Sequence, residues 1–249
     1  MNKLKAVFWD VDGTLADTEM NGHRKAFNQA FKIFNLDWVW DKKLYKSLLK
    51  ISGGHNRIKH YSNSINYDLN DTKLRDIQST KQYCYNKILK EENIPLRIGV
   101  KRLLKELFEN KIQQWIVTTS GISAVNSLFQ SSLKEEINYF SGFITSEDVK
   151  KYKPDPSAYL LAVTKSKIQK DNIIVIEDSI IGLKSAVNAK LSCLITVSPW
   201  NTINKDQYKY SKALVNSLGD KENRISNYIN DQQPSSGYID LKYLEQLLN

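Results

Sequence analysis

Two aspartates stand one residue apart at the end of the first apolar run, in the stretch AVFWDVDGTLADTE over residues 6–19. Side chains two residues apart in a strand point to the same side, so Asp10 and Asp12 are expected to project together. Neighbouring carboxylates repel each other and resist ionising. A turn at Asp12-Gly13 accounts for the second aspartate but leaves the first unexplained. The pair therefore indicates a metal ion at the end of this strand.

Three further polar segments follow predicted strands. They are Thr118-Thr119-Ser120-Gly121, Lys153-Pro154-Asp155-Pro156 and Glu177-Asp178-Ser179. Ligands of open α/β sheets bind outside the carboxyl ends of the strands. The four segments would therefore bring a nucleophile, hydroxyl groups, a cation and an acidic pair to one edge of a sheet.

Each of these later segments also has a purely structural interpretation. Thr118 could close its strand by bonding its own backbone, and Lys153 could be a solvated lysine beside a helix start. Glu177 and Asp178 could form an acidic helix start with Ser179 as its cap. Each segment, considered alone, is fully explained by its structural interpretation. The conjunction of all the segments in this order favours a catalytic site.

Strand-like runs alternate with helical patterns along most of the chain. The predicted strands cover residues 4–9, 115–117, 142–144, 173–176 and 194–197. Such alternation predicts an α/β fold, with a parallel sheet covered by helices on both faces. Residues 19–95 are helical throughout, which predicts a helical cap domain (19–95) inserted into a three-layer core domain (1–18 and 96–249). A loop over 219–237 and a short terminal helix complete the core.

The charge is basic and unevenly distributed. The net charge is +9, and residues 20–95 carry 14 Lys and Arg against 7 Asp and Glu. A lysine-rich solvated surface explains most of this surplus, and attraction of an anionic small molecule is the next interpretation. No nucleic-acid motif, arginine cluster or dense basic run is present, so we expect no nucleic-acid partner.

The remaining bulk properties favour a cytoplasmic protein. No window approaches the ~18 apolar residues of a membrane helix, and the first residues do not resemble a secretory signal. The only cysteines, Cys84 and Cys193, have neither metal-site spacing nor a disulfide pattern. We expect no membrane partner and a monomeric state.

The four segments resemble, in order, the motifs of the haloacid dehalogenase (HAD) superfamily: DVDGT, a strand ending in threonine, a loop lysine, and EDS. The position of the helical insertion, directly after the first motif, is similar to that in subclass I. This resemblance implies a Rossmann-like, three-layer, parallel-sheet core with an inserted α-helical cap.

The resemblance also implies a phosphatase mechanism. Asp10 would attack phosphorus and form an aspartyl-phosphate, while Asp12 would protonate the leaving group and then activate water. Thr118 and Lys153 would hold the phosphoryl oxygens. The amide of Thr119, placed at a helix start, would add a donor.

The implied cofactor is Mg²⁺, which prefers oxygen ligands. Asp10, the backbone carbonyl of Asp12 and Asp178 would be its protein ligands, with Glu177 as a further ligand or an outer partner. Dehalogenases of this superfamily lack an acid two residues after the nucleophile, so Asp12 disfavours cleavage of a carbon–halogen bond. Phosphatases and mutases both keep that acid.

Other parts of the chain resemble the CbbY-type phosphatases, so that the similarity covers nearly all of it. The segments are GHRKAFNQAF, LDWVWDKKLYKSLLKISGGHNRI, LGD and GYIDLKYLEQLL. That family converts xylulose 1,5-bisphosphate, an inhibitory by-product of Rubisco, into xylulose 5-phosphate. The resemblance therefore implies a sugar bisphosphate as the small-molecule substrate.

A bisphosphate needs a second anion site, for which Gly53, Gly54 and Arg57 are the candidates. Free backbone amides at the glycines could approach an oxyanion, and arginine binds phosphate through two donors. The family commonly has Gly-Gly-Lys-Glu-Arg, whereas this chain has Gly-Gly-His-Asn-Arg at 53–57. The alternative is that the two glycines merely break a helix.

The sugar hydroxyls would be contacted by His23 and by Asp17 or Glu19 at the hinge into the cap. The alternative for His23 is a half-buried structural histidine on an apolar helix face.

Three other functions remain as alternatives. A β-phosphoglucomutase-like enzyme would move a phosphoryl group rather than release it, and a phosphatase could act on a different small metabolite. A non-catalytic protein could bind a regulator or nucleic acid through the basic residues of the insertion.

Overall fold

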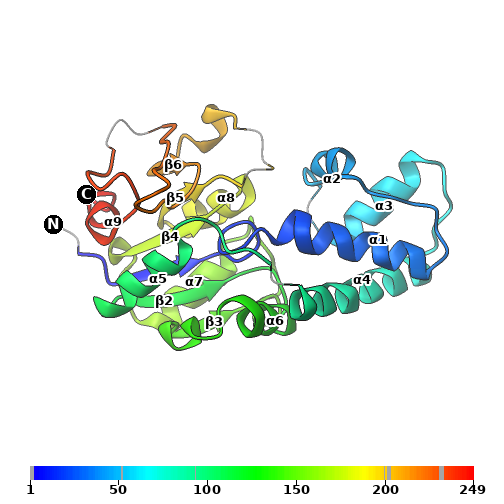
Figure 1. The fold of residues 1–249 in the computed structure, drawn as a ribbon, viewed down its shortest axis with the longest axis horizontal. Helices are drawn as coiled ribbons and strands as arrows, with labels where there is room; N and C mark the ends of the chain where they lie inside the picture. Colours follow the sequence, from blue (N-terminus) through cyan, green and yellow to red (C-terminus); the bar gives the residue numbers. More distant parts are fainter. Residues whose placement is uncertain (1–2, 52, 93, 199, 201–202, 230–232) are drawn as a thin grey trace. The chain divides into compact units, whose positions relative to one another are not determined.

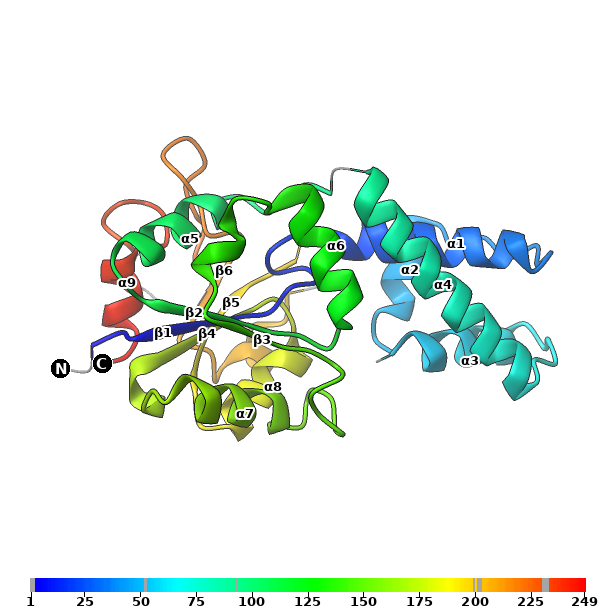
Figure 2. The ribbon, with the colours of Figure 1, turned by 90° about the horizontal axis from the view of Figure 1, so that it is seen from below.

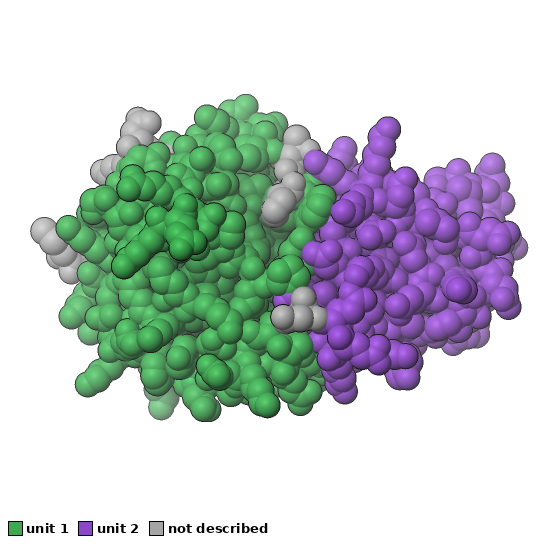
Figure 3. Space-filling model, viewed as in Figure 1, with its two compact units in different colours: residues 1–17, 95–249 green, residues 18–94 purple. Residues whose placement is uncertain are grey.

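The computed structural model describes residues 3–51, 53–92, 94–198, 200, 203–229 and 233–249. The chain forms two compact units, coloured separately in Figure 3. The first contains Met1–Asp17 and Pro95–Asn249, and the second contains Thr18–Ile94. We describe each unit separately.

The first unit is built on a six-stranded sheet with the order β3-β2-β1-β4-β5-β6 (Figure 1). The strands are β1 (Ala6–Trp9), β2 (Gln113–Val117), β3 (Gly142–Ile144), β4 (Ile173–Glu177), β5 (Ser192–Thr196) and β6 (Ala213–Val215). All neighbouring pairs are parallel. Strands β1 and β4 are buried along their whole length, as expected for a parallel sheet covered on both faces.

Helices cover both faces of this sheet. Their bounds are α5 (Val100–Glu109), α6 (Ile122–Ser132), α7 (Ser157–Ser166), α8 (Ile180–Asn188) and α9 (Leu241–Gln246). Figure 2 shows α5 and α6 on one side of the strands and α7 and α8 on the other. The predicted three-layer α/β core is confirmed.

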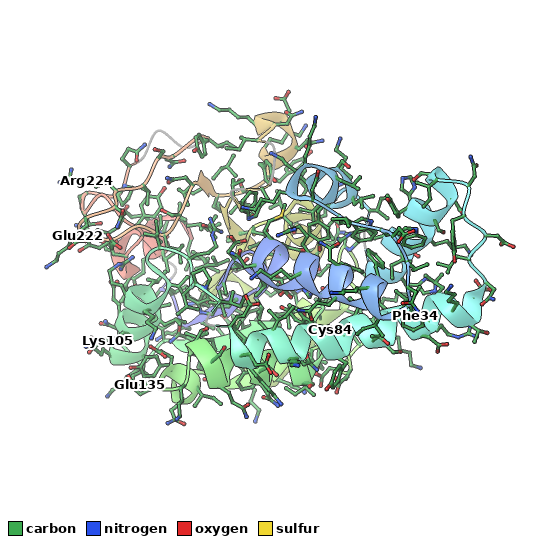
Figure 4. The ribbon with its side chains drawn as sticks, turned by 45° about the vertical axis from the view of Figure 1, so that its right-hand side comes forward. Phe34, Cys84, Lys105, Glu135, Glu222 and Arg224 are labelled. Carbon is green, nitrogen blue, oxygen red and sulfur yellow. The ribbon has the colours of Figure 1, made fainter. Side chains whose placement is uncertain are left out.

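The regular elements of the second unit are all helices within its described residues. A π-helix, η1 (Glu19–His23), leads into α1 (Arg24–Ile33), which is followed by α2 (Lys42–Leu48), α3 (Gly54–Ser64) and α4 (Asp71–Glu91). Figure 4 labels Phe34 directly after α1 and the buried Cys84 on α4. Among the described residues, no helix combines the length and the apolar character needed to cross a membrane.

A cluster of aromatic side chains forms the core of the second unit. Phe31 packs edge-on against Trp38 and Trp40, with ring centroids 5.2 and 4.9 Å apart. Phe27 lies 4.6 Å from Trp40 and 6.0 Å from Tyr45. Helix α1 supplies both phenylalanines, which lie on its buried face.

The structure adds one strand that the sequence pattern did not predict. Strand β6 has only three residues, Ala213–Val215. It pairs with β5 from Leu194 to Thr196. The predicted loop over 219–237, where Figure 4 labels Glu222 and Arg224, has neither helix nor strand in its described residues.

The two connections to the helical unit run side by side within the first unit. Ala16 and Leu96 form an isolated antiparallel bridge. The amide of Asp17 donates to the carbonyl of Pro95 (3.2 Å), and that of Arg97 donates to the carbonyl of Leu15 (2.9 Å). The chain therefore returns to the sheet beside the loop that follows β1.

A buried polar link joins β1, β2 and α5. Gln114 accepts a hydrogen bond from the indole of Trp9 (3.1 Å) and donates to the carbonyl of Leu104 (2.9 Å).

The substitution Gln114→Leu should lower the free energy of unfolding by ~1–3 kcal/mol, because the buried indole N–H of Trp9 loses its hydrogen-bond acceptor. The double variant with Trp9→Phe should cost less than the sum of the two single variants. Urea denaturation would measure both, and simple additivity would contradict the link.

Candidate active site

Asp10 is the first residue after the central strand β1 and is 7% exposed. Its amide donates to the carbonyl of Ile176 on β4 (3.0 Å). Its carboxylate accepts hydrogen bonds from the hydroxyl of Thr14 (3.2 Å) and from Nζ of Lys153 (2.8 Å). The backbone and both carboxylate oxygens of Asp10 are thus held at the carboxyl end of the sheet.

The chain turns sharply after β1, around Gly13. Gly13 has φ +86°, a conformation that favours glycine. A Cβ at this position would lie 2.3 Å from Oδ2 of Asp178. The amide of Gly13 donates to the carbonyl of Ala16 (2.9 Å). Only glycine therefore allows the loop to approach Asp178 so closely.

Lys153 joins three strand ends. Its Nζ donates to Asp10 (2.8 Å), to the carbonyl of Val117 (2.8 Å) and to Oε1 of Glu177 (2.6 Å). The side chains of Asp10, Lys153 and Glu177 are 10%, 4% and 1% exposed. The solvated-lysine interpretation is therefore wrong, because the ammonium group lies inside the protein between two carboxylates.

Glu177 is held from several sides. Its Oε1 also accepts from the hydroxyl of Tyr159 (2.8 Å), and its Oε2 accepts from the amide of Asp178 (3.2 Å). A Cβ on Gly182 would lie 1.9 Å from Cδ of Glu177, so the glycine makes room for the carboxylate. Sequence reasoning missed Tyr159. The pattern that could have identified it is a tyrosine on the buried face of the helix that follows the Lys153 loop.

Burial and charge pairing together set the protonation of Asp10 and Lys153. Burial raises the pKa of Asp10 to about 7; the charge of Glu177 adds to this shift, Lys153 opposes it, and Asp12 adds the least. Burial alone would lower the pKa of Lys153, but the carboxylates of Asp10 and Glu177 raise it overall. The lysine is accordingly the permanent cation of the site.

Asp12 has different surroundings from Asp10. Strand β1 ends at Trp9, so strand alternation does not set the directions of the two side chains. Asp12 is half-buried, and its Oδ2 accepts from the hydroxyl of Ser120. The two aspartates therefore take separate partners, a lysine and a serine.

Thr118 is buried and Thr119 is exposed. The amide of Thr118 donates to the carbonyl of Ile144 (3.0 Å), and its hydroxyl accepts from the amide of Ser120 (3.1 Å). The expectation that the amide of Thr119 lies at a helix start is wrong, because α6 begins only at Ile122 after the extended Gly121. The local hydroxyl-to-amide turn delays the helix.

Asp10, Glu177 and Asp178 form a group that could hold a cation. Each offers one carboxylate oxygen, and these oxygens lie within 4.8 Å of one another. All three residues are buried, and hard cations such as Mg²⁺ take carboxylate ligands. Each of the three residues could therefore contribute one oxygen ligand to a single cation.

The hinge residue Asp17 lies in the first unit. Its carboxylate accepts a hydrogen bond from the indole of Trp200 (2.7 Å). Sequence reasoning had no signal for this tryptophan, which lies beyond β5.

The other predicted binding residues lie in the helical unit. Glu19 accepts from the hydroxyl of Tyr45 (2.7 Å), which itself accepts from the guanidinium of Arg57 (2.9 Å). Nδ1 of the half-buried His23 lies 2.8 Å from Nζ of Lys81, a buried lysine that sequence reasoning missed.

Gly53 and Gly54 lie at the beginning of α3. Gly53 precedes the helix with φ +83°, and Gly54 is its first residue. A Cβ on Gly54 would lie 2.8 Å from Oε1 of Gln78 on α4. The two glycines thus lie where α3 begins, after α2 has ended at Leu48, which agrees with the interpretation that they interrupt the helix.

Comparisons with known proteins agree with this geometry. A model of the haloacid dehalogenase-like hydrolases matches residues 7–196. The chain belongs to this hydrolase family. It is 32% identical over 227 residues to the CBBY-like protein of Arabidopsis thaliana, covering 86% of this chain and 69% of that protein. It is 30% identical over 218 residues to Protein CbbY of Cereibacter sphaeroides, covering 87% and 94%.

A solved structure supports the same assignment for the hydrolase. The crystal structure of CbbY from Rhodobacter sphaeroides in complex with xylulose-(1,5)bisphosphate has a TM-score of 0.79 and 28% identity. The match covers 88% of this chain and 96% of that chain. The predicted enzyme class, a phosphatase of the haloacid dehalogenase superfamily, is confirmed.

The raised pKa of Asp10 predicts how the stability of the metal-free hydrolase depends on pH. The carboxyl should keep its proton in the folded protein up to about pH 7 but lose it in the unfolded chain near 3.8. Its contribution to stability is therefore present below pH 4 and is lost as the pH rises through 7. In EDTA, Asp10→Asn should gain stability relative to the wild type over this range, by a few kcal/mol (order of magnitude).

Urea denaturation at several pH values would measure this difference. Asp155→Asn is the control, because hydrogen bonds from Ser157 lower the pKa of Asp155; its stability difference should stay constant between pH 4 and 7 and change, with opposite sign, only below pH 4. A difference for Asp10→Asn that does not change with pH would contradict the prediction.

Proposed function

We propose that this hydrolase is a Mg²⁺-dependent phosphatase that converts a sugar bisphosphate, xylulose 1,5-bisphosphate, into xylulose 5-phosphate and phosphate. The observation that carries the proposal is the buried cluster in which Asp10 contacts Lys153 and lies beside Asp178. The similarity to a CbbY crystallised with that bisphosphate supports the choice of substrate.

In the proposed mechanism, Asp10 is the nucleophile. One carboxylate oxygen attacks phosphorus in line with the leaving sugar oxygen, which gives an aspartyl-phosphate. The hydrogen bonds from Thr14 and Lys153 hold the carboxylate at the strand end. Such positioning lowers the entropic cost of reaching the transition state.

Asp12 is the proposed acid and base. Its proton goes to the sugar oxygen as the phosphorus–oxygen bond breaks, and its carboxylate then takes a proton from the water that attacks the aspartyl-phosphate. The hydroxyl of Ser120 holds Oδ2 of Asp12. The separate partners of Asp10 and Asp12 suit these two roles.

Lys153 and Thr118 are proposed to bind the transferred phosphoryl group. Lys153 brings a permanent positive charge, anchored by Glu177 at 2.6 Å. The hydroxyl of Thr118 lies at the adjacent strand end and is oriented by the amide of Ser120. We also propose that the backbone amide of the exposed Thr119 donates a hydrogen bond to the phosphoryl group.

Mg²⁺ is the proposed cofactor, held by Asp10, Asp178 and the backbone carbonyl of Asp12, with Glu177 as an outer partner. When bound, it would neutralise negative charge between the carboxylates and the phosphoryl oxygens.

We propose that residues 19–95 form the cap domain and recognise the second phosphate. The amides of Gly53 and Gly54 stand at the beginning of α3, where the first N–H groups of a helix suit an anion. Arg57 follows in the first turn of that helix and contacts Tyr45 at 2.9 Å. His23, Asp17 and Glu19 are the proposed contacts to the sugar.

Phosphate release tests the proposed reaction directly. Wild-type protein with Mg²⁺ should release one phosphate from each xylulose 1,5-bisphosphate, and Asp10→Asn should abolish release because the nucleophile is lost. A colorimetric phosphate assay and ³¹P NMR of the sugar product would measure this. Product that keeps both phosphates, with one moved to another hydroxyl, would instead identify a mutase.

The proposed second phosphate site predicts a selective effect of Arg57→Lys. The substitution keeps a charge but loses the bidentate donor, so KM for the bisphosphate should rise by roughly tenfold. The kcat should stay within a few-fold, and a monophosphate substrate should be little affected. The control is His55→Ala, an exposed neighbour in the same helix. Equal effects of Arg57→Lys on both substrates would contradict the assignment.

A further inference from the structure

Arg97 gathers four backbone carbonyls at the carboxyl edge of the sheet. Its Nη1 donates to the carbonyls of Gly13 (2.6 Å) and Thr196 (2.5 Å). Its Nη2 donates to the carbonyls of Val197 (2.7 Å) and Asn216 (2.8 Å). One side chain therefore connects the loop after β1 with the segments that follow β5 and β6.

The contact with Gly13 constrains the backbone between Asp12 and Thr14. A peptide group is planar and trans, so its N–H and C=O point in opposite directions. The amide of Gly13 is held by the carbonyl of Ala16 (2.9 Å), which sets the direction of the carbonyl of Asp12. Arg97 holds the next peptide group through the carbonyl of Gly13. Together the two contacts fix both peptide groups around Gly13, which is otherwise the most flexible residue of the loop.

The position of Arg97 is itself determined by the backbone. Its amide donates to the carbonyl of Leu15 (2.9 Å), beside the bridge between Ala16 and Leu96. Both the backbone and the side chain of Arg97 thus hold the loop after β1. This segment is where the chain returns to the sheet from residues 18–94.

Charge and shape both require arginine here. Burial lowers the pKa of the Arg97 guanidinium, and the carboxylates of Asp178 and Asp17 oppose that shift; the group stays charged because its ordinary pKa exceeds 12. A guanidinium has five donors in a planar fork, whereas a lysine ammonium is a compact point charge. Lysine could not reach the same four carbonyls together.

We propose that Arg97 is a positioning residue for the reaction: its guanidinium holds the Gly13–Thr14 peptide and so, together with the hydrogen bond from the Gly13 amide to Ala16, fixes the backbone that presents the carbonyl of Asp12 to Mg²⁺ and the carboxyl of Asp12 for proton transfer. The inference rests on the proposed function, in which Asp12 has both roles. It goes beyond the four sequence motifs, because Arg97 lies outside all of them.

The test compares Arg97→Lys with Arg102→Lys. Arg102 is a matched control because it also donates to three backbone carbonyls, those of Gly219, Leu218 and Ile239. Those carbonyls belong to the C-terminal segment and not to the loop after β1. Both substitutions should lower the melting temperature to a similar degree. If Arg97 had a purely structural role, the two variants would also have the same kcat and the same Mg²⁺ dependence.

Only Arg97→Lys should change kcat and the affinity for Mg²⁺. Its kcat for phosphate release should fall by ~10–100-fold, with KM for the bisphosphate nearly unchanged, as for other residues that orient metal ligands. The Mg²⁺ concentration that gives half of the thermal stabilisation should rise by roughly tenfold. Arg102→Lys should keep the wild-type kcat and Mg²⁺ dependence.

Chemical rescue provides a second measurement if Arg97→Lys folds poorly. In Arg97→Ala, guanidinium chloride below its denaturing range should partly restore kcat, because the free cation can occupy the space between the carbonyls. Methylammonium chloride at the same concentration should not. Rescue of stability alone, without kcat, would indicate a structural role.

Two outcomes would overturn the inference: wild-type kcat and Mg²⁺ dependence in Arg97→Lys, or equal losses of both in Arg102→Lys. The Mg²⁺ titration needs no substrate, so it is decisive whichever sugar phosphate the enzyme hydrolyses. Wild-type protein that hydrolyses other sugar phosphates but not xylulose 1,5-bisphosphate would overturn the proposed substrate. The comparison of the two arginine variants would then be made on the accepted substrate.

Discussion

The ion cluster of Lys153, Asp10 and Glu177 is the constraint on which the site depends. Burying three charges is costly unless each is paired and hydrogen-bonded, and here one ammonium group contacts two carboxylates and a strand carbonyl. Removing Lys153 would leave two buried carboxylates without their counter-ion. The cluster therefore requires β1, β2, β4 and the loop before α7 to meet in one arrangement, which is also the arrangement that phosphoryl transfer needs.

Close packing of small residues and backbone supports this cluster. Gly13 lets the first loop approach Asp178, and Gly182 leaves room for the carboxylate of Glu177. Arg97 then holds the carbonyl of Gly13 in the same loop. Reactive side chains of this hydrolase are thus positioned by residues that have no reactive group, and we assign such a role to Arg97.

The helical unit uses its basic residues in a different way. Lys81 is buried, with Nζ 5.0 Å from the ring centroids of Phe27 and Tyr85. Arg57 is buried against Tyr45. These two cations lie within an aromatic core rather than on a solvated face, although most of the basic surplus of the unit is exposed. The burial of Lys81 and Arg57 is therefore a property of these two side chains and does not follow from the net charge.

The sequence by itself determined the sheet, the helical insertion and the motif residues Asp10, Asp12, Thr118, Lys153, Glu177 and Asp178, because strand-end chemistry and apolar periodicity are local properties of the chain. It did not reveal strand β6 or the late start of α6 at Ile122. Only the tertiary structure identified Tyr159 as a partner of Glu177 and Arg97 as the bridge between carbonyls. Their roles depend on contacts with residues 18 to 119 positions away, and no local pattern encodes such contacts.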